Sequence, residues 1–279
     1  FTILDGFTIQ NGGGETGAGV LTGGWLSVIR NNVIRDNASS WSGGGILVSG
    51  GVGSDGAYGN VDGMGPVIER NLIVHNSGTC GSGITTRYSL AMILNNTVAN
   101  NGGGDRARGL EILMRAGAEP TVLNNIFWNN GDDLYFQVGN TGTGLYRNNC
   151  IQDETDWHEG IVYDDPQFAD SGAGDYRIAK ASPCVEAGVP GVFPDPDESR
   201  GDIGAFFFNV PSGSGGTAVR FESLSYFDVL QKGRTRASPP RRTQATAPHV
   251  TTAARNSPST CASCAGVARS PRCRAHAPA

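Results

Sequence analysis

The sequence predicts an all-β solenoid of about six coils, and a repeated motif is the main reason. Ile29 to Asn37 (IRNNVIRDN), Ile68 to Asn76 (IERNLIVHN) and Ile93 to Asn101 (ILNNTVANN) are copies of it, with weaker copies at residues 5–11, 122–130 and 146–153. One apolar residue recurs at spacings of 25, 39, 25, 29 and 24, at positions Ile9, Ile34, Ile73, Val98, Phe127 and Ile151. Such a period, built from short β-type runs without a long helical pattern, is typical of stacked β-coils.

The motif alternates asparagine and apolar residues with the strand period of two. Stacking the coils about 4.8 Å apart brings one asparagine of each coil into line. These residues are Asn32, Asn71, Asn96, Asn125 and Asn149. Because an asparagine side chain both donates and accepts, we expect a hydrogen-bonded ladder along this line. The series from Ile9 to Ile151 is predicted to be the matching apolar ladder of the core.

A second apolar run precedes most copies of the motif, at residues 43–48 (GGGILV), 81–86 (GSGITT), 108–114 (RGLEILM) and 133–138 (DLYFQV). Alternation predicts that the following residues point inward: Ile46, Val48, Ile84, Thr86, Leu110, Ile112, Leu134 and Phe136. It also predicts two outward columns. The first holds Leu47, Thr85, Glu111 and Tyr135, and the second holds Ser49, Arg87, Leu113 and Gln137.

The GGGILV-type strands and NNxIxxN turns together resemble the right-handed parallel β-helix repeat proteins, a group that includes pectate-lyase-like folds. Later motifs are similar to the end module of secreted bacterial β-helix proteins of the choice-of-anchor type. They are DPQF at residues 165–168, GDYRI at 174–178, SPCVEAG at 182–188 and DIGAF at 202–206. The resemblance covers about residues 1–208, with Phe207 standing where the family usually has an acidic residue. It implies a right-handed single-stranded parallel β-helix and an extracellular or cell-surface location.

Three segments are expected along the chain. Residues 1–155 hold the repeats, and Phe1 to Gly6 reads as the middle of a coil, so we expect a signal peptide and earlier coils to precede it. Residues 156–211 form a loop-rich end module that caps the last rung. Residues 212–279 carry 10 of the 21 lysines and arginines but only 2 of the 26 acidic residues, and are expected to be disordered. The tail is therefore +8 and the rest −13, which argues against a nucleic-acid partner.

The best candidate site is on the outward face of the upstream strands. Arg87, Glu111 and Tyr135 are expected within two rungs, with Asp105 and Arg106 in the turn leading into the strand at residue 108. Polysaccharide lyases need a base and a cation, and hydrolases need paired carboxylates. Against catalysis, residues 1–211 contain a single lysine and no paired-Asp motif, and His75 occupies a turn position.

Two functions therefore remain open. The first is an extracellular or cell-surface module with a structural, adhesive or glycan-contacting role, and the alternative is a polysaccharide lyase or glycoside hydrolase acting along the β-helix face. No cofactor or metal site is expected, and calcium would enter only with a lyase. The expected partner is a polysaccharide or cell-surface glycan, with no membrane span and a monomeric state. Exposed aromatic residues would favour glycan contact, and the ones to inspect are Trp41, Trp128 and Tyr135.

Overall fold

The computed structural model describes residues 2–23, 27–50, 65–104, 108–113, 120–137, 145–153, 159–196 and 198–208. The chain divides into two units, residues 1–237 and 238–279, and all the described residues belong to the first. Three earlier expectations fall outside these residues. They concern the disordered tail, the turn residues Asp105 and Arg106, and the position of Phe1 within a coil.

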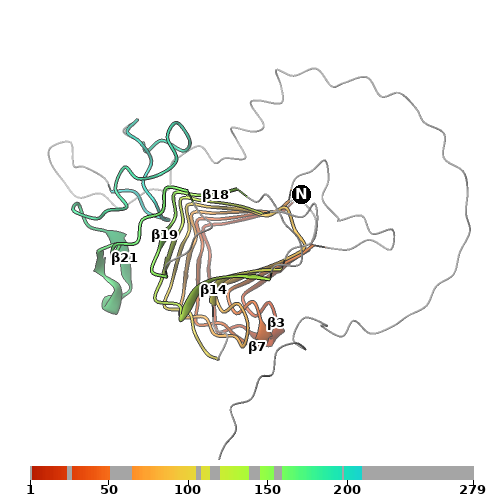
Figure 1. Ribbon diagram of the computed structural model, residues 1–279. Coiled ribbons are helices and arrows are strands. Elements are labelled where there is room, and N and C mark those ends of the chain that lie inside the picture. The colour runs from red at the N-terminus through yellow and green to blue at the C-terminus, as the bar shows by residue number, and fades with distance from the viewer. Residues whose placement is uncertain are drawn as a thin grey trace, which may run out of the picture. The chain divides into compact units, whose positions relative to one another are not determined.

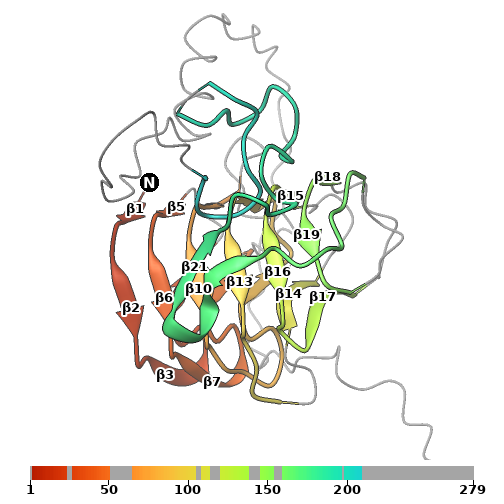
Figure 2. The same cartoon turned by 90° about the vertical axis from the view of Figure 1, so that its left-hand side faces the viewer.

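Three parallel sheets form the faces of a β-helix (Figures 1 and 2). Sheet 1 contains β1 (Thr2–Asp5), β5 (Ser27–Arg30), β9 (Val67–Glu69), β12 (Met92–Leu94), β15 (Thr121–Leu123) and β18 (Leu145–Arg147). Sheet 2 contains β2 (Thr8–Gln10), β6 (Val33–Arg35), β10 (Leu72–Val74), β13 (Thr97–Ala99), β16 (Ile126–Trp128) and β19 (Cys150–Ile151). Sheet 3 contains β4 (Val20–Thr22), β8 (Ile46–Ser49), β11 (Ile84–Arg87), β14 (Arg108–Leu113) and β17 (Asp132–Gln137).

Smaller pairs complete the described elements. Strands β3 (Gly13–Thr16) and β7 (Ala38–Ser42) pair in parallel at the corner between sheets 2 and 3. The end module contributes an antiparallel hairpin, β20 (Phe168–Asp170) and β21 (Asp175–Ile178), joined by the 3-10 helix η1 (Ser171–Ala173). No helix in the described ranges is long and apolar enough to cross a bilayer.

The solenoid has about five turns, so the expected six coils is one too many. Sheets 1 and 2 each hold six strands, but sheet 3 holds five. The motif marks the corner between sheets 1 and 2, and counting motifs therefore counts corners. The described residues that follow β19 include no further strand of sheet 3.

Strand register confirms the predicted apolar ladder. Ile9, Ile34, Ile73, Val98, Phe127 and Ile151 are successive partners in sheet 2. Together with the inward residues of sheet 3, such as Ile46, Ile84 and Leu110, they form one buried cluster. Each fully buried aliphatic side chain contributes roughly 1.5–3 kcal/mol. The core is thus a column of side chains that the repeat places at one level per coil.

The predicted asparagine ladder is present at the corner between sheets 1 and 2. Each side-chain Nδ2 donates to Oδ1 of the next member at 3.0 Å, through Asn32, Asn71, Asn96, Asn125 and Asn149. Each Oδ1 also accepts the backbone N–H of the asparagine before it. All five are buried, so these bonds satisfy a corner that would otherwise bury unpaired backbone groups.

A second ladder, which was not predicted, runs along the next corner. Its members are Asn37, Asn76, Asn101 and Asn130, linked at 2.9–3.0 Å. Asp133 closes it, because one carboxylate oxygen accepts from Asn130 Nδ2 at 2.9 Å and the other accepts from the backbone of Gln152 at 2.8 Å. The residue before each ladder asparagine has positive φ, which asparagine tolerates well. In an Asn-Asn pair, the first residue therefore makes the turn and the second bonds along the stack.

The end module lies along the solenoid as well as over its last rung. Glu159 and Val162 form parallel bridges to Arg147 and Cys150. The hairpin then crosses the outer face of sheet 2, where β21 is drawn in front of the strands in Figure 2. The buried Tyr176 of β21 packs there against Leu72, Val74 and Ala99. Cys150 and Cys184, both buried free thiols, share a further cluster with Ile126, Ile178 and Ile203.

Candidate functional site

The outward column predicted on sheet 3 has the predicted register. Leu47 pairs with Thr85, Thr85 with Glu111, and Glu111 with Tyr135. The members of this column differ in solvent exposure. Leu47 and Thr85 are buried, Glu111 is only 5% exposed and Tyr135 is 37% exposed. Tyr135 is therefore the member of this column that a ligand can reach.

An arginine that was not singled out beforehand joins Glu111 to Tyr135. Arg108 Nη1 donates to Glu111 Oε1 at 3.0 Å, and the two side chains are both almost fully buried. The guanidinium carbon of Arg108 lies 3.5 Å from the centroid of the Tyr135 ring, which is a cation–π contact. Thr85 Oγ1 lies 3.4 Å from the other carboxylate oxygen of Glu111. This arrangement fixes the tyrosine ring and engages both oxygens of the glutamate.

The remaining predicted site residues are Arg87, Asp105 and Arg106. Arg87 is half-buried at the end of β11, beside Leu113, and its Nε is buried without a hydrogen-bond partner within the described part of the chain. Asp105 and Arg106 lie outside the described residues. The column that was expected to contain Arg87, Ser49, Leu113 and Gln137 has that register. The proposed roles of these residues in binding remain predictions.

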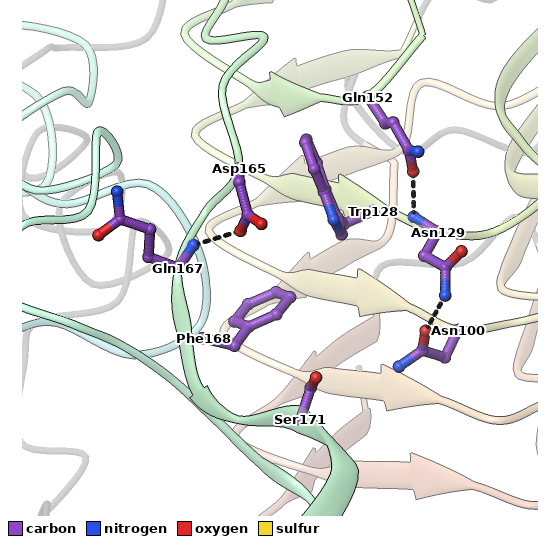
Figure 3. Close-up of a pocket in the computed structure, with 8 residues that line it drawn as sticks. All are labelled: Asn100, Trp128, Asn129, Gln152, Asp165, Gln167, Phe168 and Ser171. Atoms are coloured by element: carbon purple, nitrogen blue, oxygen red, sulfur yellow. Dashed lines mark hydrogen bonds between the residues drawn. The ribbon is translucent and has the colours of Figure 1, made fainter.

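A pocket lies where the solenoid meets the start of the end-module hairpin, and sequence reasoning did not find it. Figure 3 shows side chains from both parts around this pocket. Its volume is about 270 Å³. The solenoid supplies Asn100, Trp128, Asn129 and Gln152. The end module supplies Asp165, Gln167, Phe168 and Ser171. Of the aromatic residues expected to favour glycan contact, Trp128 lines this pocket, Trp41 is exposed on β7 and Tyr135 is on sheet 3.

Buried carboxylates hold parts of the end module together. Asp195 is buried, and its Oδ2 accepts the backbone N–H of Asp202 at 3.2 Å. Asp202 in turn accepts from the backbone N–H groups of Glu186 and Phe208. These carboxylates therefore organise the end module. The described ranges contain no group of three or more His, Cys, Asp or Glu side chains arranged to hold a metal ion.

The fold and its turns define a right-handed parallel β-helix. The family model for the right-handed β-helix region matches residues 16–170, which is more than half of the chain, and the chain therefore belongs to this family. Among solved structures it is similar to pectate lyase Pel9A, with 12% identity, 70% of each chain covered and a TM-score of 0.28. No curated protein matches the chain.

Proposed function

We propose that this chain is an extracellular or cell-surface β-helix module with a structural, adhesive or glycan-contacting role, and that the outer face of sheet 3 is its contact surface. The observation that carries the proposal is the exposed ring of Tyr135, held by a buried ion pair. Aromatic rings supply large contact area with few rotatable bonds. A ring that is already fixed loses little conformational entropy when a ligand binds.

The solenoid suits an extended partner. Its strands repeat at a constant spacing, so a long polymer that contacts Tyr135 could lie along the stack of coils. The buried ion pair between Arg108 and Glu111 supports binding more than catalysis. A general base must reach the proton that it removes, and Glu111 is nearly covered and already bonded.

The alternative is a polysaccharide lyase or glycoside hydrolase acting along the same face. One observation favours it: Arg87 lies on the strand next to Glu111, and its Nε is buried and unpaired within the described ranges. An arginine beside a bound uronate could neutralise the carboxylate or take part in proton abstraction. In that case calcium would be the ion expected to assist.

A screen of the whole protein against acidic and neutral polysaccharides separates the two functions. Retardation in affinity gels should be reduced in Tyr135→Ala and retained in Tyr163→Ala, which removes another exposed tyrosine on the end module. Ultraviolet absorbance of unsaturated product and reducing ends should stay at background, with and without calcium. Product that disappears in Arg87→Ala would establish the enzymatic alternative and overturn the binding proposal.

A further inference from the structure

The pocket beside Trp128 is a second surface feature, separate from sheet 3, and its polar side chains are held in place before any ligand arrives. Gln152 Oε1 accepts the backbone N–H of Asn129 at 3.0 Å. Asn129 Nδ2 donates to Oδ1 of Asn100, whose own Nδ2 donates to the hydroxyl of Tyr176 at 2.7 Å. Figure 3 shows these amides in a line along one wall. These hydrogen bonds fix the orientation of each side-chain amide. The amide atoms that make no hydrogen bond within this chain of bonds therefore also point in fixed directions.

Several polar atoms on the pocket wall remain available for a ligand. Within the described part of the chain, no protein group bonds to Asn129 Oδ1, Gln152 Nε2, Ser171 Oγ or the indole nitrogen of Trp128. Asp165 uses one oxygen to accept the backbone N–H of Gln167 at 2.7 Å. The wall thus offers both donors and acceptors, which is what a ring with several hydroxyl groups requires, since each hydroxyl can donate and accept.

Two aromatic side chains supply the apolar part of the pocket. Trp128 projects outward from β16, and Phe168 begins β20 on the facing wall. Both are half-buried, so part of each ring is covered by protein and part is open. Small-molecule pockets typically combine aromatic walls with a few placed polar groups, and those for drug-sized ligands occupy roughly 300–1,000 Å³. A hollow of about 270 Å³ fits a smaller ligand, such as one sugar ring.

The charge of the pocket favours one class of ligand over another. Among the eight described side chains that line the pocket, Asp165 is the one that ionises, and none of the eight is a lysine or arginine. An anionic sugar would meet a carboxylate without a compensating cation, whereas a neutral sugar can use that carboxylate as a strong acceptor. We propose that this pocket is a binding site for a single neutral sugar residue. It goes beyond the contact proposed on sheet 3, because it rests on different residues on a different face.

Protein-detected NMR of the whole protein tests this assignment. The probes are the methyl pyranosides of glucose, galactose, mannose and rhamnose, with galacturonate as the anionic comparison. At least one neutral glycoside should shift the Trp128 indole signal, identified by its loss in Trp128→Phe, and the side-chain amide signals of Asn129 and Gln152. Binding should saturate, with a dissociation constant in roughly the millimolar range expected of a single small ring.

Variants locate the binding. Asp165→Ala and Gln152→Ala should each weaken it by about tenfold or more, because each removes a polar contact. Gln10→Ala is the matched control, since Gln10 is an exposed glutamine at the end of another strand of sheet 2. Tyr135→Ala should leave this binding intact while reducing polysaccharide retention, so the two proposals can fail separately. The proposal is wrong if no neutral glycoside binds, if galacturonate binds as well or better, or if affinity survives both pocket substitutions.

Discussion

The hydroxyl of Tyr176 lies 3.0 Å from Nε2 of His75, although 101 residues separate them in the sequence. His75 has a φ of 56°, which confirms its expected place as a turn residue. The same hydroxyl accepts from Asn100 Nδ2, so a single tyrosine of the end module bonds to two successive coils. These contacts fasten the hairpin to the corner after sheet 2.

Replacing Tyr176 by Phe should lower the free energy of unfolding by about 1–2 kcal/mol. The substitution keeps the buried ring and removes two hydrogen bonds, each worth about 1 kcal/mol. Urea unfolding followed by circular dichroism measures the change. Tyr135→Phe is the control, because it removes a tyrosine hydroxyl from an exposed side chain, and an equal loss in both variants would contradict the role assigned to the Tyr176 hydroxyl.

Asp133 should make stability depend on pH in an unusual direction. Burial raises the pKa of this carboxyl from 3.8 to about 6, against the opposing effect of hydrogen bonds from Asn130 and Gln152. Between these two pKa values the folded protein holds a proton that the unfolded chain releases. The contribution of this group therefore increases as pH falls from about 7 to 4, by roughly 3 kcal/mol in total.

Asp133→Asn should remove that contribution. We expect the difference in unfolding free energy between wild type and variant to change between pH 7.5 and pH 4.5, with the wild type gaining relative to the variant at the lower pH. Asp164→Asn removes the same charge from an exposed position and serves as the comparison. A difference that stays constant with pH would show that Asp133 titrates alike in both states.

Replacing a ladder asparagine by aspartate should destabilise the fold. Asn96 Nδ2 donates to the carbonyls of Ile68 and Leu94 and to Oδ1 of Asn125. In Asn96→Asp a buried carboxylate oxygen would replace the donating amide and would lie against these three acceptor oxygens. We expect the free energy of unfolding to fall by at least about 3 kcal/mol. Asn11→Asp provides the control, because Asn11 is an exposed turn residue at a position where the next coil has Asp36. Thermal unfolding of the two variants should differ widely, and similar melting temperatures would argue against the ladder.

The pair of Arg108 and Glu111 should behave as a structural unit. Arg108→Met would remove the guanidinium that bonds to Oε1 of the buried Glu111, at a cost of about 3–5 kcal/mol. Adding Glu111→Leu should recover most of that loss, since an apolar pair needs no compensation. Denaturant unfolding of both single variants and the double variant gives the coupling energy. Additive losses would mean that the two side chains act independently.

Much of the scaffold was predictable because each coil repeats the same chemistry. Ile34 and Ile73 are register partners on adjacent coils. Because the same motif position recurs in every coil, it predicts the strand register even where the number of residues between copies varies. The second ladder also left a signal, since Asn37, Asn76, Asn101 and Asn130 recur at the end of the motif. The coil count was wrong because the motif marks corners.

The candidate sites were harder to predict, for physical reasons. Period-two alternation placed Glu111 outward correctly, but Arg108 is three residues away and the rule would put it on the other face. Arg108 begins β14 beside a corner, where the chain direction changes and its side chain can turn toward Glu111. The pocket depends on how the aperiodic end module lies against sheet 2, and no repeat relates Gln152 to Asp165.

The lateral placement of the end module also bears on how the molecule opens. Coils of a solenoid touch only their neighbours, so they can fray one at a time. Here the module bonds to Asn148, Asn124, Asn95 and His75, which belong to four successive coils. Those coils should therefore exchange their amide hydrogens together, as one cooperative block with nearly uniform protection. The surfaces proposed for binding at Tyr135 and Trp128 both lie on this block, which would therefore present them to a ligand on a stiff support.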